Sequence, residues 1–365
     1  MKLSACLLLL GLAPQLFAAP VLEQQTLWTA GQDGYHTYRI PALLVTAKGS
    51  VLAFCEGRKT SSGDHGDVDL IMKRSTDGGR TWSPHRIVHE EGGEAKITIG
   101  NPCPVVDSKT GSIWLPFTRD NKAVFITSST DDGQTWSAPR NLSATTMKPD
   151  WDWVATGPGI GIQLASGRLL IPSYHSETNK MYRSHAIFSD DHGATWQLGG
   201  IAADNTSEPQ VIELDSHTLL MNARTIAGFG GHRTQVISRD RGTTWQPAEG
   251  LASLVENQCQ GCIYRCFRSG SNGQFDWFFT HPITPGRVGV HAWISEDSGK
   301  SWPHAQQLWS GPSAYTVMTR LQGGLVGLLM ECGEKQTYEQ IVFLKFAPEW
   351  LKAGKAPELK PPPAK

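Results

Sequence analysis

Six otherwise apolar segments of this sequence end in polar side chains that could do chemistry. These ends are Arg58, Arg119 with Asp120, Tyr174 with His175, Arg224, His281 and Glu331. Arginine has a planar, two-pronged donor group that matches a carboxylate, whereas Glu, His and Tyr can transfer protons. Brought together, such groups would form a site that binds an anion and performs acid-base chemistry. For Arg119 or His281 alone, a strand end emerging into solvent explains the polarity equally well.

A repeated eight-residue pattern indicates which elements would position these groups. The pattern Ser-x-Asp-x-Gly-x-Thr/Ser-Trp occurs at residues 75–82, 129–136, 189–196, 238–245 and 295–302. Each copy follows a short run typical of a half-buried strand, so the pattern predicts a hairpin turn. The Asp would accept bonds from turn N–H groups, the Gly would supply a positive φ, and the Trp would pack beneath the hairpin. Each copy has too few oxygen ligands for a calcium loop.

A second repeat lies half a period out of step with the first. It is a turn followed by an apolar strand, in the segments GSVLAFCEGR, GSIWLPFTRD, GRLLIPSYH, HTLLMNAR, GQFDWFFTHP and GGLVGLLMECG. Six such units predict an all-β fold, a six-bladed β-propeller, as one domain over residues 20–352. Its hairpins would carry the eight-residue pattern described above, which we call the Asp box. We expect these six strands to be the innermost of their blades, so that their polar ends meet at the central axis.

Composition and the chain ends set further limits. Lys and Arg number 33 against 34 Asp and Glu, a formal net charge of −1, which excludes the basic surface of a nucleic-acid-binding protein. Residues 1–19 have Lys2, an apolar stretch and small residues before Pro20, the pattern of a secretory signal peptide. We therefore expect an exported protein, periplasmic or secreted, or lysosomal in a eukaryote. The Pro- and Lys-rich segment 353–365 is predicted to be disordered.

Six cysteines follow the predicted signal peptide, and three of them, Cys259, Cys262 and Cys266, lie close together in sequence. A zinc site would need a fourth ligand that the sequence does not place nearby. Disulfide pairing and buried thiols both remain open for them.

The five boxes together with Tyr38-Arg39-Ile40-Pro41 resemble the Asp-box exo-α-sialidases, or neuraminidases, and the resemblance runs from about residue 26 to residue 348. It implies hydrolysis of terminal α-linked sialic acids from glycoproteins, oligosaccharides and gangliosides, with retained configuration and without a metal or organic cofactor. Family members use a tyrosine nucleophile where other glycosidases use a carboxylate. A neutral phenol avoids like-charge repulsion at an anomeric carbon that already carries a carboxylate.

The resemblance also implies roles for individual residues. Arg39, Arg224 and Arg287 would bind the sialic acid carboxylate, with Arg265 or Arg320 as substitutes for Arg287, whose local motif is weaker. Glu331 would orient Arg39. The remaining implied roles are Tyr315 as nucleophile, Glu208 as its base, Asp64 as general acid and base with Asp67 as second choice, and Arg58 and Asn101 as substrate-pocket residues.

Two alternatives to hydrolysis remain at this stage. A sialic-acid-binding propeller without catalysis would need the arginines but not Tyr315, Glu208 and Asp64 together. A trans-sialidase would use the same residues and differ in the aromatic side chains of its acceptor site. The expected partners are sialylated glycans, with no nucleic acid and no stable membrane insertion, and the expected state is a monomer.

Overall fold

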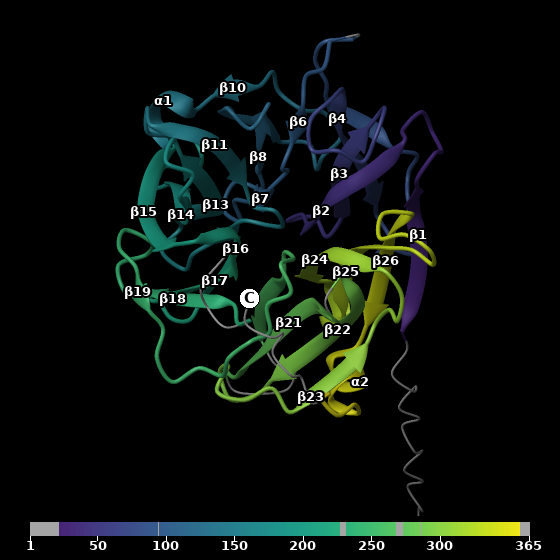
Figure 1. Ribbon diagram of the computed structural model, residues 1–365, viewed down its shortest axis with the longest axis vertical. Helices are drawn as coiled ribbons and strands as arrows, with labels where there is room; N and C mark the ends of the chain where they lie inside the picture. Colours follow the sequence, from purple (N-terminus) through teal and green to yellow (C-terminus); the bar gives the residue numbers. More distant parts are fainter. Residues whose placement is uncertain (1–21, 94, 227–230, 268–272, 285, 358–365) are drawn as a thin grey trace, which may run out of the picture.

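A computed structural model describes residues 22–357 except 94, 227–230, 268–272 and 285. In this part of the chain six antiparallel sheets are arranged in a ring, as Figure 1 shows. The chain is therefore a six-bladed β-propeller, as the two repeats predict. The predicted signal peptide, residues 1–19, lies outside the described residues.

Each of the first three blades is one sheet. Blade one consists of β2 (Thr37–Val45), β3 (Val51–Arg58), β4 (Val68–Ser75) and β5 (Arg86–His89). Blade two consists of β6 (Ile99–Gly100), β7 (Val105–Val106), β8 (Ile113–Arg119), β9 (Ala123–Ser129) and β10 (Arg140–Asn141). Blade three consists of β11 (Trp151–Thr156), β12 (Ile162–Gln163), β13 (Leu169–Glu177), β14 (Tyr182–Ser189) and β15 (Gln197–Asp204).

The other three blades have four strands each in the described residues. Blade four consists of β16 (Thr206–Glu213), β17 (Leu219–Thr225), β18 (Thr234–Ser238) and β19 (Gln246–Pro247). Blade five consists of β20 (Cys262–Phe267), β21 (Phe275–Thr284), β22 (Val288–Ser295) and β23 (His304–Gln307). Blade six consists of β24 (Ser313–Arg320), β25 (Val326–Cys332), β26 (Gln340–Phe346) and β1 (Glu23–Thr29). The short helices are α1 (Ser143–Thr146), η1 (Gln322–Gly324) and α2 (Pro348–Lys352).

The ring is closed by pairing between the two ends of the sequence. Strand β1 is antiparallel to β26, with Glu23 opposite Lys345, and it completes the sixth blade as its outer strand. The sixth unit has no Asp box, and the sequence repeats did not reveal β1. Because the first strand belongs to the last blade, the ends of the ring are held together by a sheet rather than by a loop.

The expectation about the innermost strands is wrong. The six repeated apolar strands are β3, β8, β13, β17, β21 and β25, and each is preceded in its sheet by another strand closer to the axis. The inner strands β2, β16, β20 and β24 contact their neighbours in adjacent blades. Since adjacent strands are antiparallel, the end of a second strand lies beside the start of an inner strand. The polar ends therefore still lie on one face of the ring.

The Asp boxes form the predicted hairpin turns between the third and fourth strands of five blades. In the first box, Asp77 Oδ1 accepts hydrogen bonds from the N–H groups of Arg80 and Thr81, at 3.0 and 2.9 Å, and Gly79 has a φ of 84°. The same Asp-to-backbone contacts occur at Asp131, Asp191, Asp240 and Asp297. These carboxylates are thus occupied by their own turns, which confirms the structural interpretation of the boxes.

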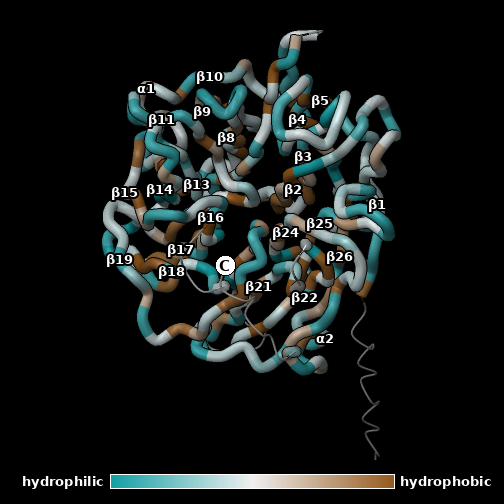
Figure 2. Tube along the Cα trace, viewed as in Figure 1, coloured by the Kyte–Doolittle hydropathy of each residue, from teal (hydrophilic) through white to brown (hydrophobic). Residues whose placement is uncertain are grey.

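The core lies between neighbouring blades, where the faces of successive sheets pack together. Phe54 and Leu70 of blade one, for example, pack with Leu115 and Phe117 of blade two, and all four are fully buried. In Figure 2 the brown, hydrophobic stretches follow the strands, whereas the outer connections are mostly teal or white. The described cysteines are all buried free thiols: Cys55, Cys103, Cys259, Cys262, Cys266 and Cys332.

The described chain continues past the predicted domain boundary at residue 352. The N–H of Ala356 donates to the Pro303 carbonyl at 3.1 Å, and His304 Nδ1 contacts the Gly354 carbonyl at the same distance. Segment 353–357 is therefore packed against blade five, and the rest of the predicted tail lies outside the described residues. Within the described ranges, no helix has the length and apolar character needed to span a membrane.

Candidate active site

The candidate site is built at the starts of the inner strands. Arg39, Glu208 and Tyr315 are each the third residue of their inner strand, in β2, β16 and β24. In all three strands the pairing register is irregular at or next to that residue. Such bulges redirect a side chain out of the regular alternation of a strand. Glu208 has a φ of 42°, which is a strained backbone that a bulge can hold in place.

Tyr315 and Glu208 are in direct contact at the centre of the site. The Tyr315 hydroxyl donates a hydrogen bond to Glu208 Oε1, and both side chains are buried. Arg224, from the end of β17, donates from Nη1 to the other carboxylate oxygen at 2.9 Å. Burial first, and then the negative charge of Glu208, raises the pKa of Tyr315 well above its ordinary value. Tyr315 is therefore a neutral phenol beside its proton acceptor.

Arg39 is oriented by Glu331, as the resemblance implies. Arg39 Nε donates to Glu331 Oε1 at 2.9 Å, and the backbone N–H of Ile40 donates to the same oxygen at 2.8 Å. The second oxygen accepts from the N–H of Tyr315 at 3.2 Å. Glu331 is completely buried. Because its carboxylate accepts from both Arg39 and the Tyr315 N–H, it holds the arginine and the strand that carries the phenol. Burial opposes the charge on Arg39, but the Glu331 carboxylate together with Tyr338 and Tyr315 offsets burial and raises the Arg39 pKa well above its ordinary value.

Arg287 is the second arginine that lies close to the phenol ring. Its guanidinium carbon is 5.5 Å from the centre of the Tyr315 ring, and that of Arg39 is 5.1 Å from the same point. Within the described chain Arg287 donates to neutral groups, the Tyr338 hydroxyl at 2.7 Å and the Gln258 carbonyl at 3.1 Å. It therefore retains an uncompensated charge for an anionic ligand. The fallback Arg265 stacks on Phe275 instead, away from this group.

Asp64 lies at the rim of the site and touches two of the predicted arginines. Its Oδ1 is 3.0 Å from Arg58 Nη1 and 3.7 Å from Arg39 Nη1, and its side chain is 66 % exposed. Partial desolvation opposes ionisation, but the charges of Arg58 and Arg39 together lower the pKa of Asp64. The second choice, Asp67, pairs with Lys59 at 3.2 Å. The structure thus brings Asp64, and not Asp67, to the arginines.

Arg58 and Asn101 are linked by Glu56, which the sequence did not single out. Arg58 donates to Glu56 Oε2 from Nε at 2.9 Å and from Nη2 at 2.6 Å, while the N–H of Asn101 donates to Glu56 Oε1 at 2.9 Å. Asn101 has a φ of 58°, a left-handed conformation that asparagine tolerates better than most residues. The buried Glu56 carboxylate thereby ties blade two to the arginine that holds Asp64.

Not every polar strand end belongs to this group. Arg119 is partly exposed and pairs with Glu91 at 2.7 Å and with Asp120 at 3.2 Å, and with none of the site residues named above. His281 is buried behind the site, where its Nε2 contacts the Cys259 carbonyl at 3.1 Å. Tyr338, which the sequence missed, packs its ring 4.0 Å from the Arg39 guanidinium and accepts from Arg287. It lies in the connection between β25 and β26, where no motif marks it.

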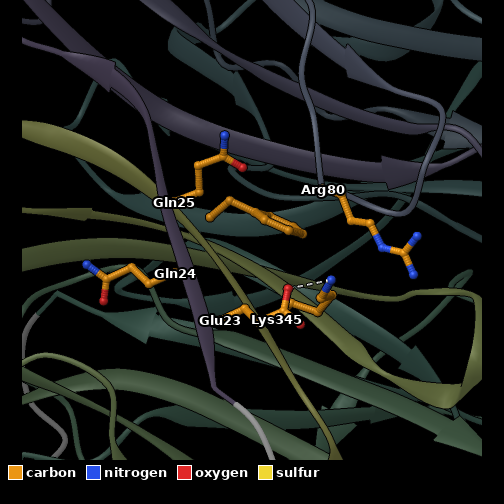
Figure 3. Close-up of a pocket in the computed structure, with 7 residues that line it drawn as sticks. Glu23, Gln24, Gln25, Arg80 and Lys345 are labelled. Carbon is orange, nitrogen blue, oxygen red and sulfur yellow. Dashed lines mark ion pairs between the residues drawn. The ribbon is translucent and has the colours of Figure 1, made fainter.

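A separate hollow of about 460 Å³ lies at the outer edge of the ring, between β1, β26 and the first Asp box, and Figure 3 shows its lining. Lys345 in its wall is paired with Glu23 at 2.7 Å. Neither the arginines nor the phenol of the candidate site lines it. Among the described residues no group of three or more His, Cys, Asp or Glu side chains is placed to hold a metal ion.

The fold and site together define an Asp-box β-propeller whose axis carries a carboxylate-paired tyrosine among arginines. Residues 49–328 match the family model described as a BNR repeat-like domain. The chain is 30% identical over 348 residues to the sialidase of Bacteroides fragilis, covering 87% of this chain and 64% of that protein. It is 30% identical over 370 residues to sialidase-2 of Mus musculus, covering 90% of this chain and 96% of that protein.

A solved structure, that of the Hadza microbial sialidase Hz136, superposes with a TM-score of 0.80 at 30% identity, covering 88% of this chain and 68% of that one. The chain belongs to the sialidase family of BNR, or Asp-box, repeat proteins. It spans less than two thirds of the length of the Bacteroides relative and nearly the full length of the mouse relative.

Proposed function

We propose that this protein is an exo-α-sialidase that hydrolyses terminal α-linked sialic acids from glycoproteins, oligosaccharides and gangliosides with retained configuration. The observation that supports this most directly is the Tyr315 hydroxyl donating to Glu208 between the guanidinium groups of Arg39, Arg224 and Arg287. Sialic acid carries a carboxylate on its anomeric carbon. An arginine-lined pocket binds that carboxylate, and a neutral phenol approaches the adjacent carbon without like-charge repulsion.

In the first step the glycosidic bond breaks. Protonated Asp64 gives its proton to the glycosidic oxygen, and the leaving sugar departs as an alcohol. The Tyr315 oxygen forms a bond to the anomeric carbon while its proton passes to Glu208. The phenol needs this acceptor because its own pKa is raised, so deprotonation accompanies attack. The result is a covalent sialyl-tyrosine.

In the second step water replaces the tyrosine. The Asp64 carboxylate takes a proton from water, whose oxygen bonds to the anomeric carbon as the bond to Tyr315 breaks. The departing phenolate recovers its proton from Glu208. Two displacements at one carbon return the original configuration. All groups in both steps belong to the chain, the substrate or water, so the proposed cycle includes no metal or organic cofactor.

Purified protein assayed with an α-sialoside of a fluorescent alcohol across pH 4 to 8, beside Tyr315→Phe, tests this proposal. Release by the wild type and none by the variant is the expected result. Binding of sialic acid by both proteins without release would instead establish the non-catalytic propeller. Adding lactose during turnover distinguishes the trans-sialidase, because a transferase would form sialyllactose in place of free sialic acid.

We also propose that the protein acts outside the cytoplasm on sialylated glycans. The supporting observation is the segment with signal-peptide character at residues 1–19. Expression of the full chain followed by N-terminal sequencing of the exported product tests this. Cleavage near Ala19 is expected, and an uncleaved intracellular product would contradict it.

A further inference from the structure

The proposed general acid, Asp64, lies on the connection between β3 and β4, residues 59–67, which we call the acid loop. The loop is closed at its base, where the N–H of Lys59 donates to the Asp67 carbonyl at 3.1 Å. Because the Asp64 side chain is mostly exposed, little packing holds its carboxylate in place. The position of this carboxylate therefore depends on the contacts that hold the backbone of the acid loop.

Two contacts hold the acid loop, one on each side of Asp64. Before Asp64, the Ser62 carbonyl accepts from Arg58 Nη1, the same nitrogen that donates to Asp64. After Asp64, the Thr98 hydroxyl accepts from the Gly66 N–H at 3.1 Å and donates to the Gly66 carbonyl at 3.0 Å. Thr98 is buried and directly precedes β6 of blade two. A single side chain of the neighbouring blade thus holds the second half of the acid loop.

Thr98 is held in turn by Asp120, one of the polar strand ends that take no part in the central group. The N–H of Thr98 donates to Asp120 Oδ1 at 2.9 Å, and the N–H of Asp120 donates to the Thr98 carbonyl at 2.8 Å. Asp120 has a φ of 53°, a left-handed conformation that aspartate tolerates better than most residues. Its other carboxylate oxygen accepts from Arg119 at 3.2 Å. These bonds give the Thr98 hydroxyl a defined place from which to hold Gly66.

We propose that Thr98 is a positioning residue for the general acid and that Asp120 holds Thr98 in place for this role. This inference rests on the proposed hydrolysis of sialosides and adds the residues that keep Asp64 within reach of the glycosidic oxygen. Loss of the Thr98 hydroxyl would leave the N–H and the carbonyl of Gly66 without this partner, and the acid loop would shift to hydrate them. Proton transfer from Asp64 needs hydrogen-bond geometry at the leaving oxygen, so such a shift slows it.

Two substrates that differ in their need for a proton test this role. The lactose of 3′-sialyllactose must be protonated as it leaves, whereas the fluoride of sialosyl fluoride leaves as an anion. Thr98→Val keeps the shape of the side chain and removes its hydroxyl, and we expect it to lower kcat/KM for 3′-sialyllactose by roughly tenfold. For sialosyl fluoride, kcat/KM should stay within about twofold of the wild-type value. Thr98→Ser, which keeps the hydroxyl, should restore most of the activity on 3′-sialyllactose.

Asp120 supplies an independent pair of variants. Asp120→Ala removes the acceptor of the Thr98 N–H and should also lower kcat/KM for 3′-sialyllactose alone, whereas Asp120→Asn keeps an acceptor oxygen and should retain most of the activity. Thr127→Val is the matched control, because Thr127 is a buried threonine of the same blade whose hydroxyl donates to the Ser137 carbonyl. It should change kcat/KM for neither substrate.

An equal loss on both substrates in Thr98→Val would overturn the proposal, because Thr98 would then serve the fold or the site as a whole. An unchanged kcat/KM for 3′-sialyllactose would overturn it as well, since the acid loop would then keep its place without the hydroxyl. If the wild type hydrolysed neither substrate, the proposed hydrolase function itself would fail, and the positioning role with it.

Discussion

The Tyr315 hydroxyl donates a hydrogen bond to the Glu208 carboxylate, although the two residues are 107 positions apart in the sequence. They come from the inner strands of different blades, so the ring itself brings nucleophile and base together. Arg224 holds the second Glu208 oxygen, and Glu331 accepts the backbone N–H of Tyr315. Each partner is therefore fixed by a second ionic group before substrate arrives, which is the preorganisation that catalysis by this pair requires.

Asp64 should act as the general acid. Asp64→Asn should reduce kcat/KM for 3′-sialyllactose by about a hundredfold or more, whereas sialosyl fluoride, whose leaving group needs no proton, should lose far less. Asp67→Asn is the matched control, because Asp67 pairs with Lys59 and not with the arginines. Steady-state kinetics on both substrates checks this. A larger loss in Asp67→Asn than in Asp64→Asn would reverse the assignment.

Activity should also depend on pH through Asp64. The charges of Arg58 and Arg39 outweigh partial desolvation and lower the pKa of Asp64, so the carboxyl is mostly ionised above about pH 5. The protonated form that the first step uses is therefore scarce at pH 8 and becomes more abundant as pH falls. We therefore expect kcat/KM for 3′-sialyllactose to rise from pH 8 to pH 5. The same profile measured with sialosyl fluoride should be flatter. Equal pH profiles for the two substrates would contradict this prediction, because the pH dependence would then not come from protonation of the leaving group.

Arg224 should contribute to binding of the sialic acid carboxylate. Arg224→Ala removes a partly buried cation that faces Glu208 and the phenol, and we expect sialic acid binding to weaken by roughly 2 to 5 kcal/mol. Titration calorimetry with sialic acid measures the change. A loss below about 0.5 kcal/mol would place Arg224 outside the binding site.

Glu256 should position two of the arginines without touching the substrate. Its carboxylate accepts the N–H groups of Thr225 and Cys259, both at 3.1 Å, and pairs with the buried Arg233 at 2.9 Å. Thr225 follows Arg224, and the nearby Gln258 carbonyl accepts from Arg287. We expect Glu256→Gln to raise KM roughly three- to tenfold with little change in kcat, because carboxylate binding acts on ground and transition states alike.

The matched substitution for that test is Glu213→Gln at the opposite end of β16, where the glutamate accepts the Ala165 N–H. Its kinetic constants should stay at the wild-type values. An unchanged KM in Glu256→Gln, or a loss confined to kcat, would argue against a positioning role.

A buried histidine pair predicts acid sensitivity of the fold. His175 and His185 are fully buried with their Nδ1 atoms 3.0 Å apart, and burial lowers the pKa of His175 to about 4. Glu177, Arg183, Lys148 and Asp150 are the charged groups around His175. The unfolded chain binds the proton near pH 6.5 and the folded chain does not, so the free energy of unfolding should fall as pH drops from about 6.5 to 4.

That loss should amount to about 2 to 3 kcal/mol for His175 between pH 7.5 and 4.5. Urea unfolding at the two pH values measures it. In His175→Gln this part of the pH dependence should disappear, even though the variant is less stable overall. The exposed His217→Gln should behave as the wild type. A pH dependence unchanged in His175→Gln would assign the acid sensitivity to other groups.

The fold was predictable from sequence because its turn chemistry is local. Ser75, Asp77 and Gly79 form a closed set of hydrogen bonds within one turn, so the pattern appears in the sequence wherever the turn occurs. The outer strand β1 has no such mark. It acquires its place only by pairing with β26 at the other end of the chain, which is a long-range contact that a local pattern does not encode.

The residues of the site were predictable only where they lie in a recognisable sequence motif. Arg39 and Glu331 lie in recognisable segments, and their ion pair joins residues 292 positions apart. Glu56 and Tyr338 were missed because their importance lies in what they contact, namely Arg58 in one case and Arg39 with Arg287 in the other.

If Tyr315 is the nucleophile, it becomes covalently attached to sialic acid during turnover. Incubation with 2,3-difluorosialic acid, whose second fluorine slows the release step, followed by digestion and mass spectrometry of the peptides, tests it directly. One fluorosialyl group is expected on the peptide containing Tyr315 in the wild type and none in Tyr315→Phe. An adduct on the peptide that contains Glu208, or turnover of the reagent by Tyr315→Phe, would contradict it.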